Sequence, residues 1–259
     1  MRYESPFKHK KALGLALIAC IWINTTGAAF AQSIQTLRAE AIKGDVAAET
    51  NLAARYGLGR DLPQNYAKAI YWFRLAAHQR YAAAEYFLGS FYNLGRGVPQ
   101  NYAKAAYWWR LAAHQGYADA EYDLGYVYDL GRGVPQNYAK AAYWYRLDAK
   151  QGDAFAENNL GLLYEHGHGV PQNYAKAAYW YRLAAKQGDA ESQYNLGLLY
   201  DHGEGVPQNY AKSYFWFDLA AANGDKHAAH DRDIVANLMT PAELAEAQNQ
   251  ASQYVAAHK

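Results

Sequence analysis

The stretch that decides the fold is Pro99-Gln100-Asn101-Tyr102-Ala103-Lys104-Ala105-Ala106-Tyr107-Trp108. It recurs unchanged twice and with small changes twice more. The prolines that open it are spaced 36 residues apart, as Pro63, Pro99, Pro135, Pro171 and Pro207. A leucine and, four residues later, a tyrosine keep the same register, as Leu88 and Tyr92 do in the second unit. Self-similarity at a fixed period predicts an array of stacked repeats.

Each unit is predicted to hold two helices. Within residues 81–116, apolar residues first recur at the spacing of three and four that marks one helical face. The turn Gly95-Arg96-Gly97-Val98-Pro99 then ends that helix, because glycine permits positive φ and proline cannot continue a helix. Asn101 is a suitable N-cap for a second helix from about Tyr102 to His114, and Gly116 suits the left-handed residue that ends it.

Further positions carry local expectations. Asp153, Asp189 and Asp225 follow the terminal glycine and are predicted to cap the next first helix. Arg80 stands once where that glycine is expected, at a cost of about 1 kcal/mol if the left-handed conformation is kept.

Glycine also recurs inside the first helix, where it lowers helix stability by about 0.5–1 kcal/mol relative to alanine. The positions are Gly89, Gly125, Gly161 and Gly197, with Ala53 in the first unit. We therefore expect a neighbouring helix to approach too closely for a side chain. Tyr56, Tyr66 and Trp72, with their equivalents, are expected to act as aromatic wedges between helices.

The combined pattern resembles the Sel-one-like repeat family. In the second unit it is written by Ala82, Ala84, Leu88-Gly89, Tyr92, Gly95, Gly97-Val98, Lys104-Ala105, Trp108, Ala112-Ala113 and Gly116. The family is similar to tetratricopeptide repeats, so the resemblance implies an all-α solenoid, a right-handed superhelix of antiparallel helix pairs. The resemblance covers about residues 44–224, with departures at Asp61, Leu62, Asp148 and Ser192.

The repeats and their ends give a predicted domain organisation. The five units are expected at about 44–79, 80–115, 116–151, 152–187 and 188–223. Residues 32–43 are expected to form a capping helix in front of them, and residues 225–259 a degenerate sixth repeat with a C-terminal capping helix. Thr240-Pro241-Ala242-Glu243 is a capping-box start for that last helix.

Residues 1–31 are predicted to be a signal peptide. Basic residues at 8–11 precede the apolar run 12–23, which is shorter than the roughly 20 residues of a spanning helix. Ala29-Phe30-Ala31 fits a cleavage site, so the mature chain is expected to begin at Gln32 and to be periplasmic or secreted. Two alternatives are lipidation at Cys20, as in a lipoprotein, and an uncleaved anchor helix.

Composition narrows the classes of function. Cys20 is the only cysteine, so a chain without residues 1–31 has no disulfide, thiol nucleophile or cysteine metal site. The 25 Lys and Arg against 24 Asp and Glu become a net charge of −2 once that segment is removed. Neither value indicates a nucleic-acid partner, and no second apolar stretch predicts a membrane span.

Some positions differ from repeat to repeat although the residues around them recur. These variable positions are the candidates for recognition of a protein or peptide partner. On the first helix they lie one and two residues before the fixed leucine, and two and five residues after it. By resemblance to tetratricopeptide arrays they line a concave groove, and the predicted binding residues are Tyr86, Phe87, Asn93, Tyr122, Asp123, Tyr126, Asp129, Asn158, Asn159, Glu165, Tyr194, Asn195 and Asp201.

The chemistry of this set suits peptide recognition. Asparagine bonds both peptide groups, tyrosine offers flat contact area, and the acids favour basic segments. The alternative is that these positions simply drift on a solvated face.

No enzyme, cofactor or metal site is expected. The histidines at 166, 168 and 202 stand near acids at 165, 201 and 204, but in glycine-rich turns where polar residues are usual. Two functional alternatives remain. One is an envelope enzyme or cell-wall accessory, because cysteine-rich relatives in the family are described as β-lactamases. The other is an exported effector that acts on a host cell.

Overall fold

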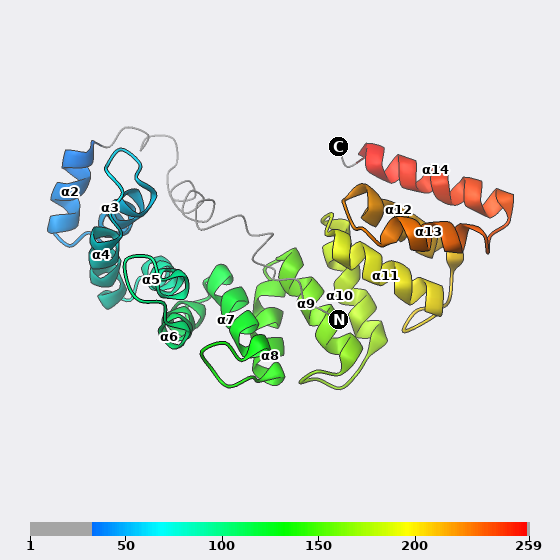
Figure 1. The fold of residues 1–259 in the computed structure, drawn as a ribbon, viewed down its shortest axis with the longest axis horizontal. Helices are drawn as coiled ribbons and strands as arrows, with labels where there is room; N and C mark the ends of the chain where they lie inside the picture. Colours follow the sequence, from blue (N-terminus) through cyan, green and yellow to red (C-terminus); the bar gives the residue numbers. More distant parts are fainter. Residues whose placement is uncertain (1–32, 258–259) are drawn as a thin grey trace. The chain divides into compact units, whose positions relative to one another are not determined.

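The computed structural model of the chain describes residues 33–257, so the predicted signal peptide lies outside the described residues. The described part consists of helices, labelled α2 to α14, joined by turns and without strands (Figure 1). The all-α prediction is therefore confirmed. The chain divides into two compact units, one ending at Pro135 and one beginning at Gln136, and each is described by itself.

The helices alternate between two recurring kinds. The first helices are α3 (Val46–Leu58), α5 (Ala82–Leu94), α7 (Ala118–Leu130), α9 (Ala154–His166) and α11 (Ala190–His202). The second helices are α4 (Tyr66–His78), α6 (Tyr102–Ala113), α8 (Tyr138–Ala149), α10 (Tyr174–Lys186) and α12 (Tyr210–Ala222). The helices α2 (Ile34–Ile42), α13 (Ala228–Ala236) and α14 (Pro241–Ala257) flank this series.

Asparagine begins every second helix, as predicted. The side chains of Asn65, Asn101, Asn137, Asn173 and Asn209 each accept a backbone N–H from three residues ahead, at 2.8–2.9 Å. The first helices α9 and α11 use aspartate in the same way, since Asp153 and Asp189 accept at 2.9 and 2.8 Å, whereas α5 and α7 begin at tyrosines that make no side-chain cap bond. The Asp225 carboxylate accepts from the backbone N–H groups of His227 and Ala228 ahead of α13. The caps predicted at Asp153 and Asp189 are thus confirmed, whereas α13 begins at the N-cap His227, two residues after Asp225.

The turn residues adopt the left-handed conformation that their positions require. Gly116 has φ +78° with open space around a Cβ, so the turn itself, not crowding, favours glycine there. Arg80 takes the same place in the preceding repeat and has φ +60°, as expected. Asp61, which replaces a glycine of the interhelical turn, has φ +59°.

In α5, α9 and α11 the glycine inside the first helix lies against a large ring. A Cβ built on Gly89 would stand 2.7 Å from Cδ1 of Trp109. The corresponding distances are 2.5 Å from Gly161 to Cε1 of Tyr181, and 2.6 Å from Gly197 to Phe217. A Cβ at such distances would force the ring to shift, so the predicted close approach is confirmed in these three repeats.

The residue that makes this approach corrects the prediction of the wedge. Trp72 and its equivalents at 108 and 180 are only half-buried, whereas the equivalents Trp144 and Trp216 are buried. The fully buried wedge is the next residue, namely Phe73, Trp109, Tyr145, Tyr181 and Phe217. Adjacent residues of a helix point about 100° apart, so one of the two aromatics faces the first helix and the other lies at its flank.

The fixed tyrosine of each first helix links neighbouring repeats. The Tyr92 hydroxyl accepts a hydrogen bond from the Arg74 guanidinium at 2.8 Å, while the Lys104 ammonium lies 5.3 Å from the ring centroid. The same arrangement recurs at Tyr56, Tyr164 and Tyr200. These fixed residues are therefore fully used by packing within and between repeats.

Helix α14 closes the C-terminal end. The Thr240 hydroxyl accepts the Glu243 N–H at 3.3 Å, and the Glu243 carboxylate accepts the Thr240 N–H at 2.9 Å, which confirms the capping box. Ala247 and Ala251 are buried, and α14 packs on α12. The apolar face of the last full repeat is covered in this way.

Candidate functional site

The fixed acids of the first helices are structural. Glu49, Glu85 and Glu157 are 2–3% exposed, and each accepts a hydrogen bond from a glutamine 30 residues later, at 2.6–2.9 Å. Burial raises the pKa of all three, and that of Glu157 to about 7. In the fifth repeat Gln193 takes this place and accepts from Asn223 at 3.0 Å. These groups serve packing within and between repeats.

The variable positions are distributed between the two units. The unit ending at Pro135 carries Tyr86, Phe87, Asn93, Tyr122, Asp123, Tyr126 and Asp129, on α5 and α7. The second unit carries Asn158, Asn159, Glu165, Tyr194, Asn195 and Asp201, on α9 and α11. Within each unit they lie on consecutive first helices.

Burial separates the thirteen predicted residues into two groups. The buried ones are Tyr86, Phe87, Asn93, Tyr122, Tyr126, Asp129 and Asn158. The half-buried ones are Asp123, Asn159, Glu165, Tyr194, Asn195 and Asp201. Phe87 is 1% exposed and packs against Phe73 with ring centroids 5.4 Å apart, so it belongs to the core. Accessible variable side chains are therefore concentrated on the second unit.

Neighbouring repeats meet through a recurring pair 37 residues apart. The Tyr194 hydroxyl donates to the Asp231 carboxylate at 2.7 Å. One repeat earlier, the Asn195 amide donates to the Asn158 side-chain oxygen at 3.5 Å. In the compact unit that ends at Pro135, burial raises the pKa of the Tyr86 phenol, and the nearby Asp123 carboxylate raises it further. In each pair, the first residue lies two before the fixed leucine of its own repeat. The second residue lies one before the corresponding position of the next repeat.

The same spacing identifies residues that the sequence reasoning missed. Asp231 and Ile234 lie 36 residues after Asn195 and Leu198, so they hold variable positions of a sixth first helix, α13. The signal that identifies these two residues is the 36-residue period of the repeats. After Gly224 the recurring phrase decays, but counting 36 residues onward still places both residues in the frame.

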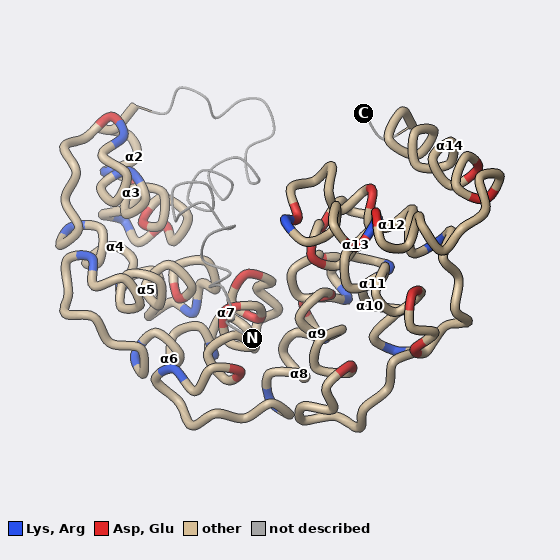
Figure 2. Tube along the Cα trace, turned by 45° about the vertical axis from the view of Figure 1, so that its right-hand side comes forward, with Lys and Arg blue, Asp and Glu red and all other residues tan. Residues whose placement is uncertain are grey.

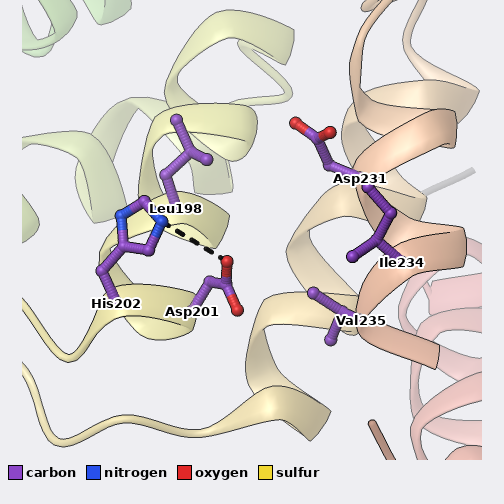
Figure 3. A pocket seen from close by; sticks show the side chains of 6 residues that line it. All are labelled: Leu198, Asp201, His202, Asp231, Ile234 and Val235. Carbon is purple, nitrogen blue, oxygen red and sulfur yellow. Dashed lines mark ion pairs between the residues drawn. The ribbon is translucent and has the colours of Figure 1, made fainter. Parts of the chain in front are cut away.

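A pocket of about 160 Å³ lies between α11 and α13 (Figure 3). Figure 3 shows side chains of α11 facing those of α13 across it. The lining residues are Leu198, Asp201, His202, Asp231, Ile234 and Val235. Two carboxylates and three aliphatic side chains thus share the lining. Drug-sized ligands occupy pockets of roughly 300–1,000 Å³, so this pocket suits a single side chain better than a larger molecule.

The histidines considered for metal binding lie in turns and at helix ends. His202 Nε2 lies 3.5 Å from the Asp201 carboxylate, and the His168 ring stacks on Tyr138 with centroids 4.7 Å apart. The Glu165 carboxylate accepts the Tyr181 hydroxyl at 2.5 Å. Within residues 33–257, no group of three or more His, Cys, Asp or Glu side chains is placed to hold a metal ion.

Charge is interspersed along the described chain. Figure 2 shows acidic and basic residues mixed over the helices of each unit. Among helices α2 to α14, none combines the length and hydropathy that crossing a membrane requires.

Comparison with known families and structures agrees with this architecture. The Sel1 repeat family model matches residues 46–81, 82–117, 118–153, 154–189 and 190–225. No curated protein sequence matches the chain. A crystal structure of a Sel1 repeat protein from Oxalobacter formigenes is similar, with 28% identity and a TM-score of 0.75, over 93% of this chain and 98% of that one.

A second similar structure is a protective antigen of uropathogenic Escherichia coli strains that displays an SLR fold. It is 33% identical, with a TM-score of 0.77 over 85% of this chain. The match spans 48% of the antigen, so this chain corresponds to about half of its length. Both neighbours are helical repeat solenoids, which matches the fold predicted from the period.

Proposed function

Because the chain belongs to the Sel1 repeat family, we propose that it is an exported scaffold that binds a protein or peptide partner. The contact surface is formed by accessible variable positions on the first helices of the second unit. This surface, the variable surface, consists of Asn159, Glu165, Tyr194, Asn195, Asp201 and Asp231. Helical repeat scaffolds serve protein–protein interaction in general, and the family is generally non-enzymatic.

One observation carries the proposal. The fixed tyrosines, glycines, acids and caps of the repeat are all engaged in packing. The members of the variable surface also contact neighbouring side chains, but they differ between repeats and remain half-buried. Selection for packing explains a constant residue, but it does not explain an array of changing polar groups on one face. Such an array offers the amide, phenol and carboxylate groups that read a peptide segment.

Charge sets the expected partner chemistry. Glu165, Asp201 and Asp231 give the variable surface three carboxylates, and its other members are two asparagines and a tyrosine. A partner with lysine or arginine in the bound segment is electrostatically complementary to this surface. Association should therefore weaken as the salt concentration rises.

Export is part of the proposal and rests on the sequence of residues 1–31. Cell fractionation followed by N-terminal sequencing tests it, with a mature start at Gln32 in the periplasm or the medium as the expected result. A chain that retains Met1 in the cytoplasm would refute export. A chain starting at Cys20 with a lipid modification would assign it to the lipoproteins.

Site-specific photocrosslinking in the producing cell tests the binding surface. A crosslinking amino acid at Asn195 should capture a partner, whereas the same group at Tyr179, which is 53% exposed on second helix α10, should not. Capture from position 179 alone would move the binding surface to the second helices. Turnover of cell-wall or β-lactam substrates by the purified chain would favour an enzyme instead.

A further inference from the structure

The pocket between α11 and α13 makes the proposed function more specific. It is built by two first helices, with Leu198 and Asp201 on one side and Asp231 and Ile234 on the other. All four occupy positions that differ between repeats. The pocket is thus part of the face on which partner binding is proposed, and what it accepts constrains the partner.

The lining combines two chemistries. Leu198, Ile234 and Val235 form apolar walls, and Ile234 leaves 49% of its surface exposed although it is a large hydrophobic residue. Asp201 and Asp231 place carboxylates on opposite helices of the same pocket (Figure 3). Lysine and arginine match this combination, because their stems lie along apolar surface while the charged head stays with polar partners.

The chain does not supply the complementary cation from its own lining residues. None of the six is lysine or arginine, and His202, which lies 3.5 Å from Asp201, is 56% exposed at its side chain. Arg232 is adjacent on α13, but its guanidinium donates to Asp218 and Asp233, each at 2.9 Å. The negative charge of the pocket is therefore available to a cation from outside.

Tyr194 fixes one of the two carboxylates. Its hydroxyl donates to Asp231 at 2.7 Å, and burial, followed by that same hydrogen bond, raises the pKa of the Tyr194 phenol. A carboxylate held by a neighbour loses less conformational freedom when a ligand binds. The geometry is thus set before a partner arrives.

We infer that this pocket receives one lysine or arginine side chain of the bound partner, with the stem against Leu198, Ile234 and Val235 and the cation between Asp201 and Asp231. The inference rests on the proposed function, since it names the side chain that the variable surface selects. Its volume of about 160 Å³ restricts it to one side chain.

Nuclear magnetic resonance titration of the isotope-labelled full chain tests the inference with three small probes. These are the N-acetyl, N-methylamide derivatives of lysine, of arginine and of norleucine, which has an apolar chain and no charge. The lysine or the arginine probe should give saturable shifts at residues 198–202 and 231–235. The norleucine probe should bind at least about tenfold more weakly, the factor that corresponds to about 1.4 kcal/mol.

Matched variants make the result specific. Asp201→Asn combined with Asp231→Asn should weaken the cationic probe about tenfold or more, while Glu246→Gln, on exposed α14, should leave its affinity unchanged. Unchanged amide shifts elsewhere confirm that the double variant is folded. Equal binding to the double variant, or equal shifts at exposed carboxylates throughout the chain, would overturn the inference. If partner capture through Asn195 persists in that case, the proposed function stands and only the pocket assignment falls.

Discussion

Gly161 on α9 lies so close to Tyr181 on α10 that a Cβ on the glycine would stand 2.5 Å from the ring atom Cε1. The relationship repeats at Gly89 with Trp109 and at Gly197 with Phe217, whereas the first repeat packs its two helices with Ala53 at this position. A residue that weakens an isolated helix thereby stabilises the helix pair.

The first prediction concerns this approach. Gly161→Ala should lower the free energy of unfolding by about 1–3 kcal/mol, because overpacking outweighs the gain in helix propensity of about 1 kcal/mol. Gly57→Ala is the matched control, since it is also helical but its Cβ would stand 3.1 Å from the tip of the Phe91 ring. Chemical denaturation should show little loss for the control. Equal losses in both variants would contradict the packing argument.

The second prediction concerns the buried acid of the fourth repeat. Burial raises the pKa of Glu157 from 4.5 to about 7, so the folded chain holds a proton that the unfolded chain releases between these values. Stability should therefore fall as pH rises from about 4.5 through 7. Glu157→Gln should reduce this fall, to which Glu49 and Glu85 also contribute, and stabilise the fold at pH 8 by an amount on the order of 1 kcal/mol, since partial solvation weakens the effect.

The fifth repeat supplies the control for this acid. Gln193 already takes the place of the glutamate and pairs with Asn223 at 3.0 Å. Gln193→Glu should add to the loss of stability with rising pH that Glu157→Gln reduces. Thermal unfolding from pH 5 to pH 8 checks both, and a Glu157→Gln variant that keeps the slope of the parent chain would exclude this group as its source.

The third prediction concerns a buried hydroxyl. Ser213 is fully buried on α12, and its Oγ makes no hydrogen bond within the described chain, whereas the other four repeats have alanine there. An unsatisfied buried polar group costs about 1–3 kcal/mol. Ser213→Ala should therefore stabilise the chain by roughly 1 kcal/mol in denaturant unfolding.

Ser192→Ala is the comparison for Ser213. The Ser192 hydroxyl is equally buried but lies 2.9 Å from the Asn158 side-chain oxygen, so its removal should be destabilising. The two serine-to-alanine changes should thus have opposite signs. The same sign for both would show that hydrogen bonding does not decide the effect.

The fourth prediction concerns Arg80, which adopts φ +60° where the other repeats place glycine. Arg80→Gly should stabilise the chain by up to about 1 kcal/mol, the cost of the left-handed conformation for a residue with a Cβ. Arg80→Ala keeps that cost and removes the same charge, so it is the control. Equal stabilities of the two variants would show that strain at this turn is negligible.

Much of the fold follows from local rules that the sequence states directly. Asn101 and Asp153 cap their helices as expected because capping depends only on the next turn of the chain. The period predicts the helix pairs, and Gly89 predicts their close approach. The wedge was assigned one residue too early, to Trp72, because a tryptophan-aromatic pair at the edge of a helical face does not reveal which member points inward.

The site could be predicted only in part. The variable positions were recognised from the sequence, but their accessibility depends on how the next repeat packs. Tyr86 and Tyr122 are buried, whereas Tyr194 is half-buried at the corresponding position. Asp231 was missed because it belongs to a helix whose sequence has lost the recurring phrase while keeping its period.

The most direct test of the central claim measures how tightly a captured partner binds two variants of this chain. One carries Asn159→Ala, Asn195→Ala and Asp201→Ala on the first helices. The other carries Tyr71→Ala, Tyr107→Ala and Tyr179→Ala at exposed sites of the second helices. With both folded, calorimetry should show at least about tenfold weaker binding, or about 1.4 kcal/mol, for the first variant only. Loss confined to the second variant would contradict the account.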